Sequence, residues 1–435
     1  MKTLISWFAL WVVLILMAAG CDGNAPVVET LKYNEQARNI VIGGSINDAQ
    51  RNRLWVEDLE YFKSEFPKRH KNPFSVITKK AFNQRMDTLI AKVGKLELHQ
   101  ICVALCEVIA AVGVAHSNID ISNEYRYPLQ FYVFADGLYV INADKTLADM
   151  LFARVTKING VGANDVMTRL TALIPHENKS WVLAMLPEYL AKPVYMYGLG
   201  IIPDQVQTVF TVEQDGIERE VAVPIFPFGQ HADFCVPMNA DDGAVDAGEY
   251  NYNYKYFEKN NALLFNYNVC GESPGLPFAE FNKGMFDFMA DKKVNRIIVD
   301  LRRNGGGNSE VLNPFTKQLP DYLKKNPGTK VYLLVGRNTF SSGIFAIHRI
   351  MAAAPRTISV GEPTGGALED YGDPSLFNLP NSWIPVRYST KYFDFRKQLK
   401  RPNQVTNTFI PEVEITPTLE DYRRKNDAVL NEAMK

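Results

Sequence analysis

The feature that most constrains the fold is a regular alternation of strand-like and helix-like segments between about residues 261 and 417. Four apolar runs are typical of buried strands, namely NALLFNYNV, VNRIIVDL, KVYLLV and RTISVG. Three stretches between them have the apolar spacing of helices, namely FAEFNKGMFDFMADK, VLNPFTKQLPDYLKK and SGIFAIHRIMAAA. This alternation predicts an α/β fold with a parallel sheet covered by helices. Ligands of such sheets bind beyond the carboxyl ends of the strands, where the loops RRNGGGNS and GRNTFSS are expected.

Two regions with different patterns precede this α/β region. Residues 29–113 have helical periodicity in three segments, and Pro67 and Pro73 are expected to separate the first helix from the second. Residues 125–227 contain five strand-like runs, and ARVTKINGVGANDVMTRL is similar to a PDZ-like module as well as to a plain hairpin. We therefore predict a helical domain at 21–120, a β-rich, PDZ-like domain at 121–230 and an α/β core domain at 231–435.

Residues 1–20 have the three parts of a secretory signal peptide. Lys2 gives a positive n-region, residues 4–17 form an apolar h-region, and small residues follow before Cys21. The ending AAGC resembles a bacterial lipobox, which implies cleavage before Cys21 and a lipid on that cysteine; the alternative is an ordinary secretory signal with a chance cysteine. The h-region is short for a membrane span, and no later segment is long and apolar enough for one. We expect a lipid anchor at Cys21 on a bacterial envelope membrane, facing the periplasm or the exterior.

Composition argues against some kinds of partner and cofactor. The formal net charge is −1 over 435 residues, whereas nucleic-acid-binding proteins carry a basic surplus or stripe. His99, Cys102 and Cys106 would share one face of a helix and could ligate zinc, but this helix is apolar nearly all round, which favours a buried structural helix. The four cysteines after Cys21 allow three disulfide pairings, among which the sequence does not choose. We expect no metal, no other cofactor and no nucleic-acid partner.

Two adjacent serines, Ser341 and Ser342, stand at the junction between a predicted strand and a predicted helix. Serine is a favoured N-cap residue, so a purely structural role is one interpretation. The other is a nucleophile, but TFSSG departs from the G-x-S-x-G elbow of α/β-hydrolases, which also require a later histidine. His348, the histidine that follows, lies about 10 Å further along the same helix axis and cannot reach Ser341. The base must therefore come from earlier in the chain or be a residue other than histidine.

The three glycines of IIVDLRRNGGGNS directly follow a predicted buried strand. Glycine allows a sharp turn and a close approach of the backbone to a ligand. Neither G-x-G-x-x-G nor G-x-x-x-x-G-K-[ST] is present, so the loop lacks these phosphate-binding motifs. An oxyanion hole is another interpretation, with an N–H of Gly306 or Gly307 and the N–H of the residue after the nucleophile as donors. A structural turn is the remaining alternative.

Three motifs in this order, IIVDLRRNGGGNS, LLVGRNTFSSGIFA and ISVGEPTGG, resemble the core of the tail-specific serine peptidases. That superfamily includes the C-terminal-processing proteases, the tricorn core and the retinoid-binding repeats of the eye. The resemblance covers about residues 261–417, and the helical N-terminal region and PEVEITPTLEDY also fit the family. It implies a crotonase-like α/β core with a nucleophilic serine at the start of the helix that follows LLVGRNTF.

One departure from the processing proteases concerns the base. Their lysine stands in GEPTFGKG, whereas this chain has GEPTGGALED, with Ala367 at that position. The tricorn-like branch uses a histidine after the N-terminal helices, and the resemblance assigns this role to His116 in AAVGVAHSNIDI. A neutral imidazole can accept the serine proton at physiological pH. The position of His116 before both serines agrees with the chain order that geometry requires.

The sequence leaves two assignments open. Alignment on T-F-S makes Ser341 the nucleophile and the Ser342 N–H an oxyanion donor, whereas counting back from Glu362 points to Ser342; we prefer Ser341. The family's glutamate near this helix start is absent, because other residues stand at 343 and 344. A carboxylate should orient His116. Four acids are near enough in sequence to do so, namely Glu362, Glu369, Asp370 and Asp373.

We predict a serine peptidase of the cell envelope, in which Ser341 forms an acyl-enzyme with a peptide or protein substrate and His116 transfers the proton. One alternative is a catalytically inactive peptide- or ligand-binding protein on the same fold, because the retinoid-binding repeats bind ligands and the family's lysine is missing. Another is a hydrolase of a non-peptide acyl substrate. The sequence does not determine the oligomeric state.

Overall fold

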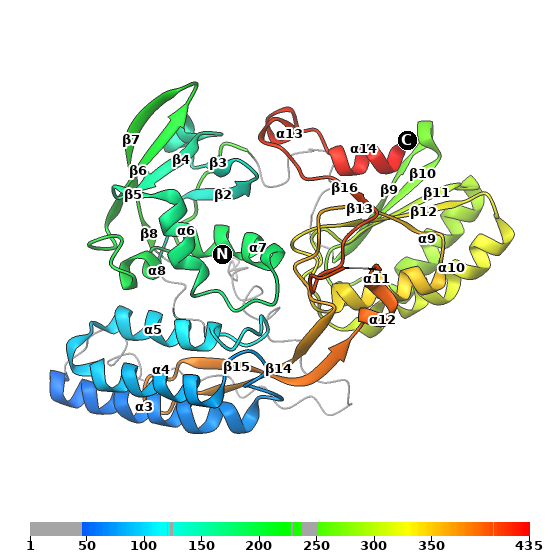
Figure 1. Ribbon diagram of the computed structural model, residues 1–435. Helices are drawn as coiled ribbons and strands as arrows, with labels where there is room; N and C mark the ends of the chain where they lie inside the picture. Colours follow the sequence, from blue (N-terminus) through cyan, green and yellow to red (C-terminus); the bar gives the residue numbers. More distant parts are fainter. Residues whose placement is uncertain (1–45, 120, 122–124, 228, 237–250, 403) are drawn as a thin grey trace, which may run out of the picture.

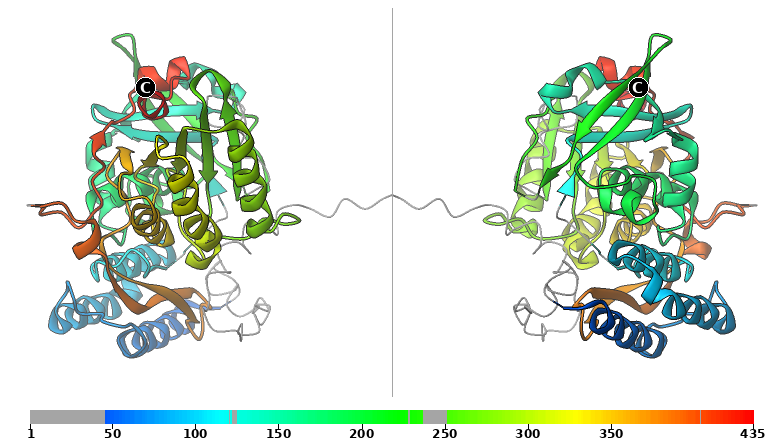
Figure 2. Two further views of the ribbon diagram at one scale, coloured as in Figure 1. Left: turned by 90° about the vertical axis from the view of Figure 1, so that its right-hand side faces the viewer. Right: turned by 90° about the vertical axis from the view of Figure 1, so that its left-hand side faces the viewer.

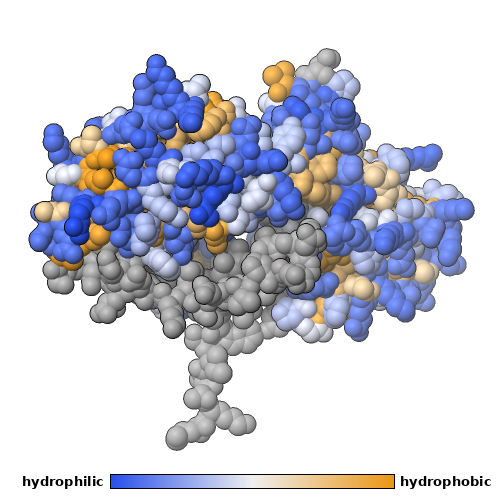
Figure 3. All heavy atoms as spheres, turned by 90° about the horizontal axis from the view of Figure 1, so that it is seen from below, coloured by the Kyte–Doolittle hydropathy of each residue, from blue (hydrophilic) through white to orange (hydrophobic). Residues whose placement is uncertain are grey.

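The protein is described by a computed structural model (Figure 1). The described residues are 46–435 except 120, 122–124, 228, 237–250 and 403, so the predicted signal peptide and Cys21 lie outside them. Within the described part of the chain, no helix has the length and apolar character needed to cross a membrane. In Figure 3 the coloured part of the surface is mainly hydrophilic, with hydrophobic patches among the hydrophilic residues.

A six-stranded sheet lies at the centre of the C-terminal half. Its strand order is β16-β13-β12-β11-β10-β9, and neighbouring strands are parallel except β9, which is antiparallel to β10. The strands are β9 (Tyr252–Phe257), β10 (Ala262–Tyr267), β11 (Arg296–Asp300), β12 (Lys330–Val335), β13 (Ile358–Gly361) and β16 (Val413–Glu414). The predicted α/β class is confirmed, and the four predicted strands pair in parallel. The edge strands β9 and β16 have no counterpart in the sequence prediction.

Both faces of this sheet are covered by helices. On β10, Leu263 and Phe265 belong to one apolar cluster, and Ala262 and Leu264 belong to another. The helices that pack on these clusters are α9 (Phe278–Lys292), α10 (Asn313–Lys325) and α11 (Ser342–Ala353) on the first, and α14 (Ala428–Met434) on the second. Burial on both faces explains why the strands are continuous apolar runs in the sequence.

The β-rich region is an antiparallel sheet of order β2-β3-β4-β6-β7, with β5 paired to β4. Its strands are β2 (Leu129–Phe134), β3 (Gly137–Ala143), β4 (Arg154–Ile158), β5 (Val161–Gly162), β6 (Gln207–Gln214) and β7 (Ile217–Pro224). A separate pair joins β1 (Tyr125–Arg126) to β8 (Phe226–Pro227). Three helices accompany the sheet, α6 (Ala163–Thr171), α7 (Lys179–Leu190) and α8 (Pro193–Gly198), of which the sequence predicts the first.

The N-terminal helices are α3 (Asp48–Arg69), α4 (Lys79–Lys92) and α5 (Leu98–Ala110). The first two helices are separate as predicted, and Pro73 lies between them, but Pro67 lies inside α3, which continues to Arg69. A proline in the last turn removes few helical hydrogen bonds, and the fully buried Phe62 and Phe66 hold this end of α3 in the core. One apolar cluster contains side chains from these helices and from the β-rich sheet, so the two regions share a core.

A long hairpin connects the C-terminal half to the N-terminal helices. Its strands are β14 (Glu369–Asn378) and β15 (Pro385–Asp394), and they extend away from the six-stranded sheet to lie against α3–α5 (Figures 1 and 2). At its tip, the N–H groups of Asn381 and Ser382 donate to the buried carboxylate of Asp58 on α3, each at 2.7 Å. The hairpin therefore brings residues near 370 close to the end of α5.

The remaining elements are short. They are η1 (Val93–Lys95), η2 (Lys145–Met150), η3 (Glu258–Asn260), η4 (Ser309–Leu312), α12 (Arg396–Leu399) and α13 (Leu419–Arg424).

Candidate active site

Ser341 lies between β12 and α11, at the carboxyl end of a central strand. Its backbone has φ 53° and ψ −123°, a conformation that residues other than glycine rarely adopt. Residues held in such conformations cluster at active sites. Although Ser341 occupies the N-cap position of α11, its side chain makes no capping hydrogen bond. Helix capping therefore does not explain this serine side chain.

His116 lies beside Ser341. Its Nε2 atom is 2.9 Å from Ser341 Oγ, within hydrogen-bonding distance. The imidazole is buried and stacks on Phe340 with 4.5 Å between ring centroids, and Phe340 stacks on Trp181 at 3.9 Å. Stacked rings from three separate segments of the chain therefore fix the orientation of the imidazole next to the serine.

The other ring nitrogen of His116 faces Asp370. Nδ1 and Asp370 Oδ2 are 3.1 Å apart, and the two side chains are 6% and 12% exposed. The N–H direction does not point along this line, so the contact has the distance of an ion pair without the alignment of a hydrogen bond. Asp370 stands near the start of β14, so the hairpin that packs on the helices also supplies this carboxylate.

The other three acids that the sequence leaves open have basic partners. The pairs are Glu362–Arg337, Glu369–Arg396 and Asp373–Lys391, at 2.5, 2.6 and 3.0 Å. The first is buried, and Arg337 also donates to the carbonyl of Val133 at 2.9 Å and lies over the ring of Tyr132. This ion pair therefore attaches strand β2 of the β-rich region to the loop that carries the serine.

The glycine loop packs directly against the serines. Gly306 has φ 108°, and a Cβ atom placed on it would lie 2.7 Å from Ser341 Cβ. The Gly306 N–H donates to Asn304 Oδ1 at 2.9 Å and is therefore engaged. Among the described residues, no acceptor takes the N–H groups of Gly307 and Ser342. Two of the three candidate oxyanion donors are thus available to a ligand.

Ser342 has a different environment from its neighbour. Its hydroxyl donates to the carbonyl oxygen of Gly307 at 2.6 Å, and the residue is buried at the first position of α11. This bond holds the glycine loop against the helix start. The serine that lies beside His116 is Ser341.

A second carboxyl group lies behind Asp370. Glu177 precedes α7, and its Oε1 accepts the backbone N–H of Ala115 at 2.8 Å, next to His116. Burial raises the pKa of Glu177 well above its usual value, and the charge of Asp370 raises it further. The sequence offers no signal for this residue, because IPHENKSW has no periodicity and the helix that follows it, α7, is not predicted.

No protein-family model and no curated protein matches the sequence. Solved structures do match. A serine-to-alanine mutant of CPAF has a TM-score of 0.64 at 12% sequence identity, with 88% of this chain and 97% of that chain covered. Mature CPAF complexed with lactacystin has a TM-score of 0.61 at 12% identity, with 88% and 98% covered. The chain has the fold of CPAF.

The photosystem II D1 C-terminal processing protease is also matched, at 12% identity and a TM-score of 0.39, with 88% of this chain and 99% of that chain covered. At such identities the likeness is one of fold, so the chemistry of the site has to be argued from its own residues.

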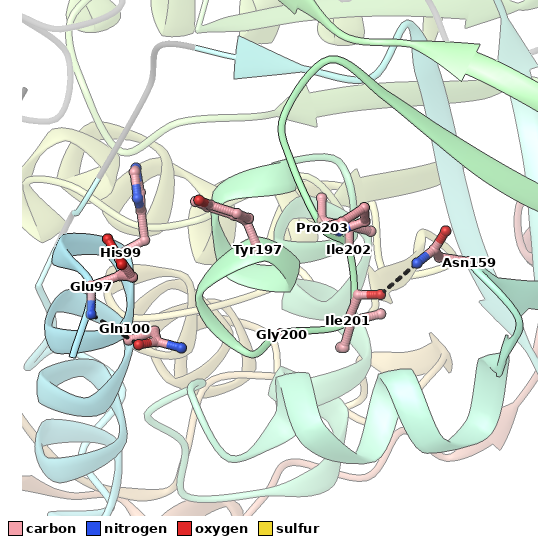
Figure 4. A pocket seen from close by; sticks show the side chains of 9 residues that line it. All are labelled: Glu97, His99, Gln100, Asn159, Tyr197, Gly200, Ile201, Ile202 and Pro203. Carbon is pink, nitrogen blue, oxygen red and sulfur yellow. Dashed lines mark hydrogen bonds between the residues drawn. The ribbon is translucent and has the colours of Figure 1, made fainter. Parts of the chain in front are cut away.

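The alternative zinc ligands do not come together. Cys102 and Cys106 are buried in the core, whereas His99 lines a cavity of about 340 Å³ between α5 and the segment after α8 (Figure 4). Burial raises the pKa of Cys102 to about 12, which disfavours the thiolate that a metal binds. Among the described residues, no cluster of three or more His, Cys, Asp or Glu side chains could hold a metal, and none of the described cysteines forms a disulfide.

Proposed function

We propose that this protein is a serine peptidase in which Ser341 is the nucleophile, His116 is the base and Asp370 orients the base. The observation that carries the proposal is the 2.9 Å separation of Ser341 Oγ and His116 Nε2 at a strained strand-to-helix junction. A general base must have this reach to the proton that it removes. The poorly aligned Nδ1 contact is compatible with the proposal, because catalytic hydrogen bonds often tighten when substrate binds.

The reaction follows from these positions. Ser341 Oγ attacks the carbonyl carbon of the scissile bond while its proton passes to His116 Nε2. The imidazolium that forms is stabilised by the carboxylate of Asp370, and it then gives its proton to the departing amine. A water molecule, deprotonated by the neutral imidazole, hydrolyses the acyl-enzyme and restores Ser341.

The negative oxygen of each tetrahedral intermediate needs hydrogen-bond donors fixed in advance. The N–H groups of Gly307 and Ser342 fit this role better than that of Gly306, because the latter already donates to Asn304. Gly306 then serves as the residue without a side chain that lets the loop contact Ser341.

Three further parts of the proposal rest on the sequence. We infer that peptides or proteins are the substrates, as expected for the tail-specific peptidases. We infer an envelope location with a lipid anchor at Cys21, from the signal peptide and the lipobox-like ending at residues 18–21. We retain a crotonase-like core at 231–435, a helical domain at 21–120 and a PDZ-like domain at 121–230 as the finer description of the fold.

A fluorophosphonate probe, which phosphonylates activated serines, tests the nucleophile and separates an enzyme from a binding protein. We expect the wild type to be labelled, Ser341→Ala to be unlabelled, and Ser342→Ala to keep labelling. Absence of label on a folded wild type would support the binding protein. Loss of label in Ser342→Ala with retention in Ser341→Ala would reverse the assignment of the two serines.

Two measurements test the substrate class and the anchor. Release of peptides from denatured casein by the wild type, and not by Ser341→Ala, supports a peptidase; hydrolysis of small acyl esters alone supports the non-peptide hydrolase. For the anchor, bacteria fed a clickable palmitate analogue should incorporate it into the wild type and not into Cys21→Ser. Equal incorporation would exclude Cys21 as the lipidated residue.

A further inference from the structure

Within the part of the chain that the structure describes, two buried carboxyl oxygens near the candidate active site have no hydrogen-bond donor. They are Glu177 Oε2 and Asp370 Oδ1, and both are sealed from solvent. The second oxygen of each carboxyl group does have a partner: Glu177 Oε1 accepts the Ala115 N–H, and Asp370 Oδ2 faces His116. A buried acceptor without a donor is costly. Two such acceptors on neighbouring groups point to a proton shared between them.

Each of the two carboxyl groups has one buried oxygen without a donor, and the charge of Asp370 acts directly on Glu177. Like charges this close cannot both be ionised in a buried site, so one group keeps its proton. Glu177 is the better candidate, because burial and the charge of Asp370 raise its pKa well above the usual range. A negative charge on Asp370 is also the one that serves His116.

Resting on the proposed function, we propose that Glu177 is a positioning residue: it is a neutral carboxylic acid whose O–H donates to Asp370 Oδ1, so that Oδ2 stays directed at His116 Nδ1. Both orphaned oxygens are satisfied by this one proton. Glu177 does not touch the reacting atoms. It acts through Asp370, by fixing the rotation of that carboxylate.

The surrounding backbone fits this role. Asn178, next to Glu177, donates to the carbonyls of Gly365 and Asn407 at 2.9 and 3.1 Å. Asn407 in turn receives the N–H of Glu369 and donates to its carbonyl, each at 2.8 Å. The segment that carries Glu177 is thereby attached to Gly365, which precedes Asp370 in the chain, and through Asn407 to Glu369, the residue next to Asp370. The Ala115 bond attaches it to the backbone of His116 as well.

Among the described residues, the charged group that acts on Glu177 is the carboxylate of Asp370 on β14, and the imidazole of His116 lies beyond it. The adjacent imidazole of His176 is bonded to the carbonyl of Ile174 at 2.6 Å. The ionisation of Glu177 therefore acts on the site through Asp370.

Three variants test this proposal by their rate of fluorophosphonate labelling across pH. Glu177→Gln preserves the shape, the bond from Ala115 and an N–H donor for Asp370, so we expect labelling at close to the wild-type rate at neutral pH. Glu177→Ala removes the donor, and we expect a loss of about 100-fold, typical of a misplaced catalytic group. Glu220→Gln, an exposed glutamate on β7, is the matched control and should behave as wild type.

The pH profile separates positioning from mere structural support. As the pH rises through the raised pKa of Glu177, the wild type should lose labelling because Glu177 ionises beside Asp370, whereas Glu177→Gln should keep its plateau. A 100-fold loss in folded Glu177→Gln, or full activity in Glu177→Ala, would overturn the proposal. An infrared band of a protonated carboxylic acid, absent in Glu177→Gln, reports the proton without any activity.

The same experiments distinguish the two proposals. A folded wild type that shows the infrared band and takes no label would refute the peptidase, and with it the positioning role. A labelled wild type without the band would refute the neutral Glu177 alone.

Discussion

Gly306→Ala is a direct test of how closely the glycine loop and the nucleophile are packed. A Cβ atom at this position would lie 2.7 Å from Ser341 Cβ, 3.0 Å from Ser342 N and 3.1 Å from Ser341 Oγ. The first distance is too short for two carbon atoms. The three neighbouring atoms belong to the backbone and to a short side chain, which cannot move aside, so the loop or the start of α11 must shift. The φ of 108° adds strain, because residues with a Cβ atom rarely adopt it.

The magnitudes follow from these contacts. Backbone strain of this kind costs about 1–3 kcal/mol of stability. A displacement of Ser341 by about 1 Å from His116 lowers the rate of acylation by about 100-fold. We therefore expect Gly306→Ala to fold with a reduced melting temperature and to react slowly with a fluorophosphonate. The rate should be measured by time-resolved labelling, with thermal unfolding followed on the same samples.

Gly305→Ala is the matched control for this experiment. Gly305 is adjacent and exposed, its φ is not positive, and no atom of the described residues lies within 4 Å of its added Cβ. It should label and melt like the wild type. Wild-type labelling by Gly306→Ala, or an equal loss in Gly305→Ala, would refute the packing argument.

Three other variants have defined expectations. Asp370→Asn should lower the labelling rate by up to about 10⁴-fold with little change in melting temperature, because an amide cannot stabilise the imidazolium of His116; a rate near wild type would remove Asp370 from the mechanism. Arg337→Met should destabilise the protein by about 3–5 kcal/mol in urea unfolding, because it leaves the carboxylate of Glu362 buried without its partner, and adding Glu362→Gln should restore part of the loss. Glu177→Gln should flatten the pH dependence of stability. Because the pKa of Glu177 is raised, the folded state holds a proton that the unfolded state releases above about pH 4.5. The free energy of unfolding of the wild type therefore falls with rising pH, by up to about 1.4 kcal/mol per pH unit, until Glu177 ionises in the folded state. Parallel curves for the two proteins would contradict a protonated Glu177.

Local sequence patterns were sufficient for the central elements of the α/β region, which are strands β10–β13 and helices α9–α11. The run KVYLLV is strand β12 as predicted, and FAEFNKGMFDFMADK is helix α9, because a strand buried on both faces and an amphipathic helix each have a direct signature in residue order. Elements with mixed composition, such as α7 and the hairpin β14–β15, lack that signature. The continuation of α3 through Pro67 depended on burial of the adjacent aromatic residues.

For the site, the sequence by itself narrowed the candidate nucleophile to two adjacent serines, Ser341 and Ser342, and its resemblance to a family indicated His116 as the candidate base. The acid behind the histidine was decided by tertiary structure. Asp370 reaches His116 because the hairpin packs on the N-terminal helices, and Glu177 reaches Asp370 because the loop before α7 is bonded to Ala115. These contacts join positions more than fifty residues apart. Residue order fixes local periodicity, whereas such contacts depend on how separately formed elements pack. Packing therefore decides which of the four candidate carboxylates lies beside His116.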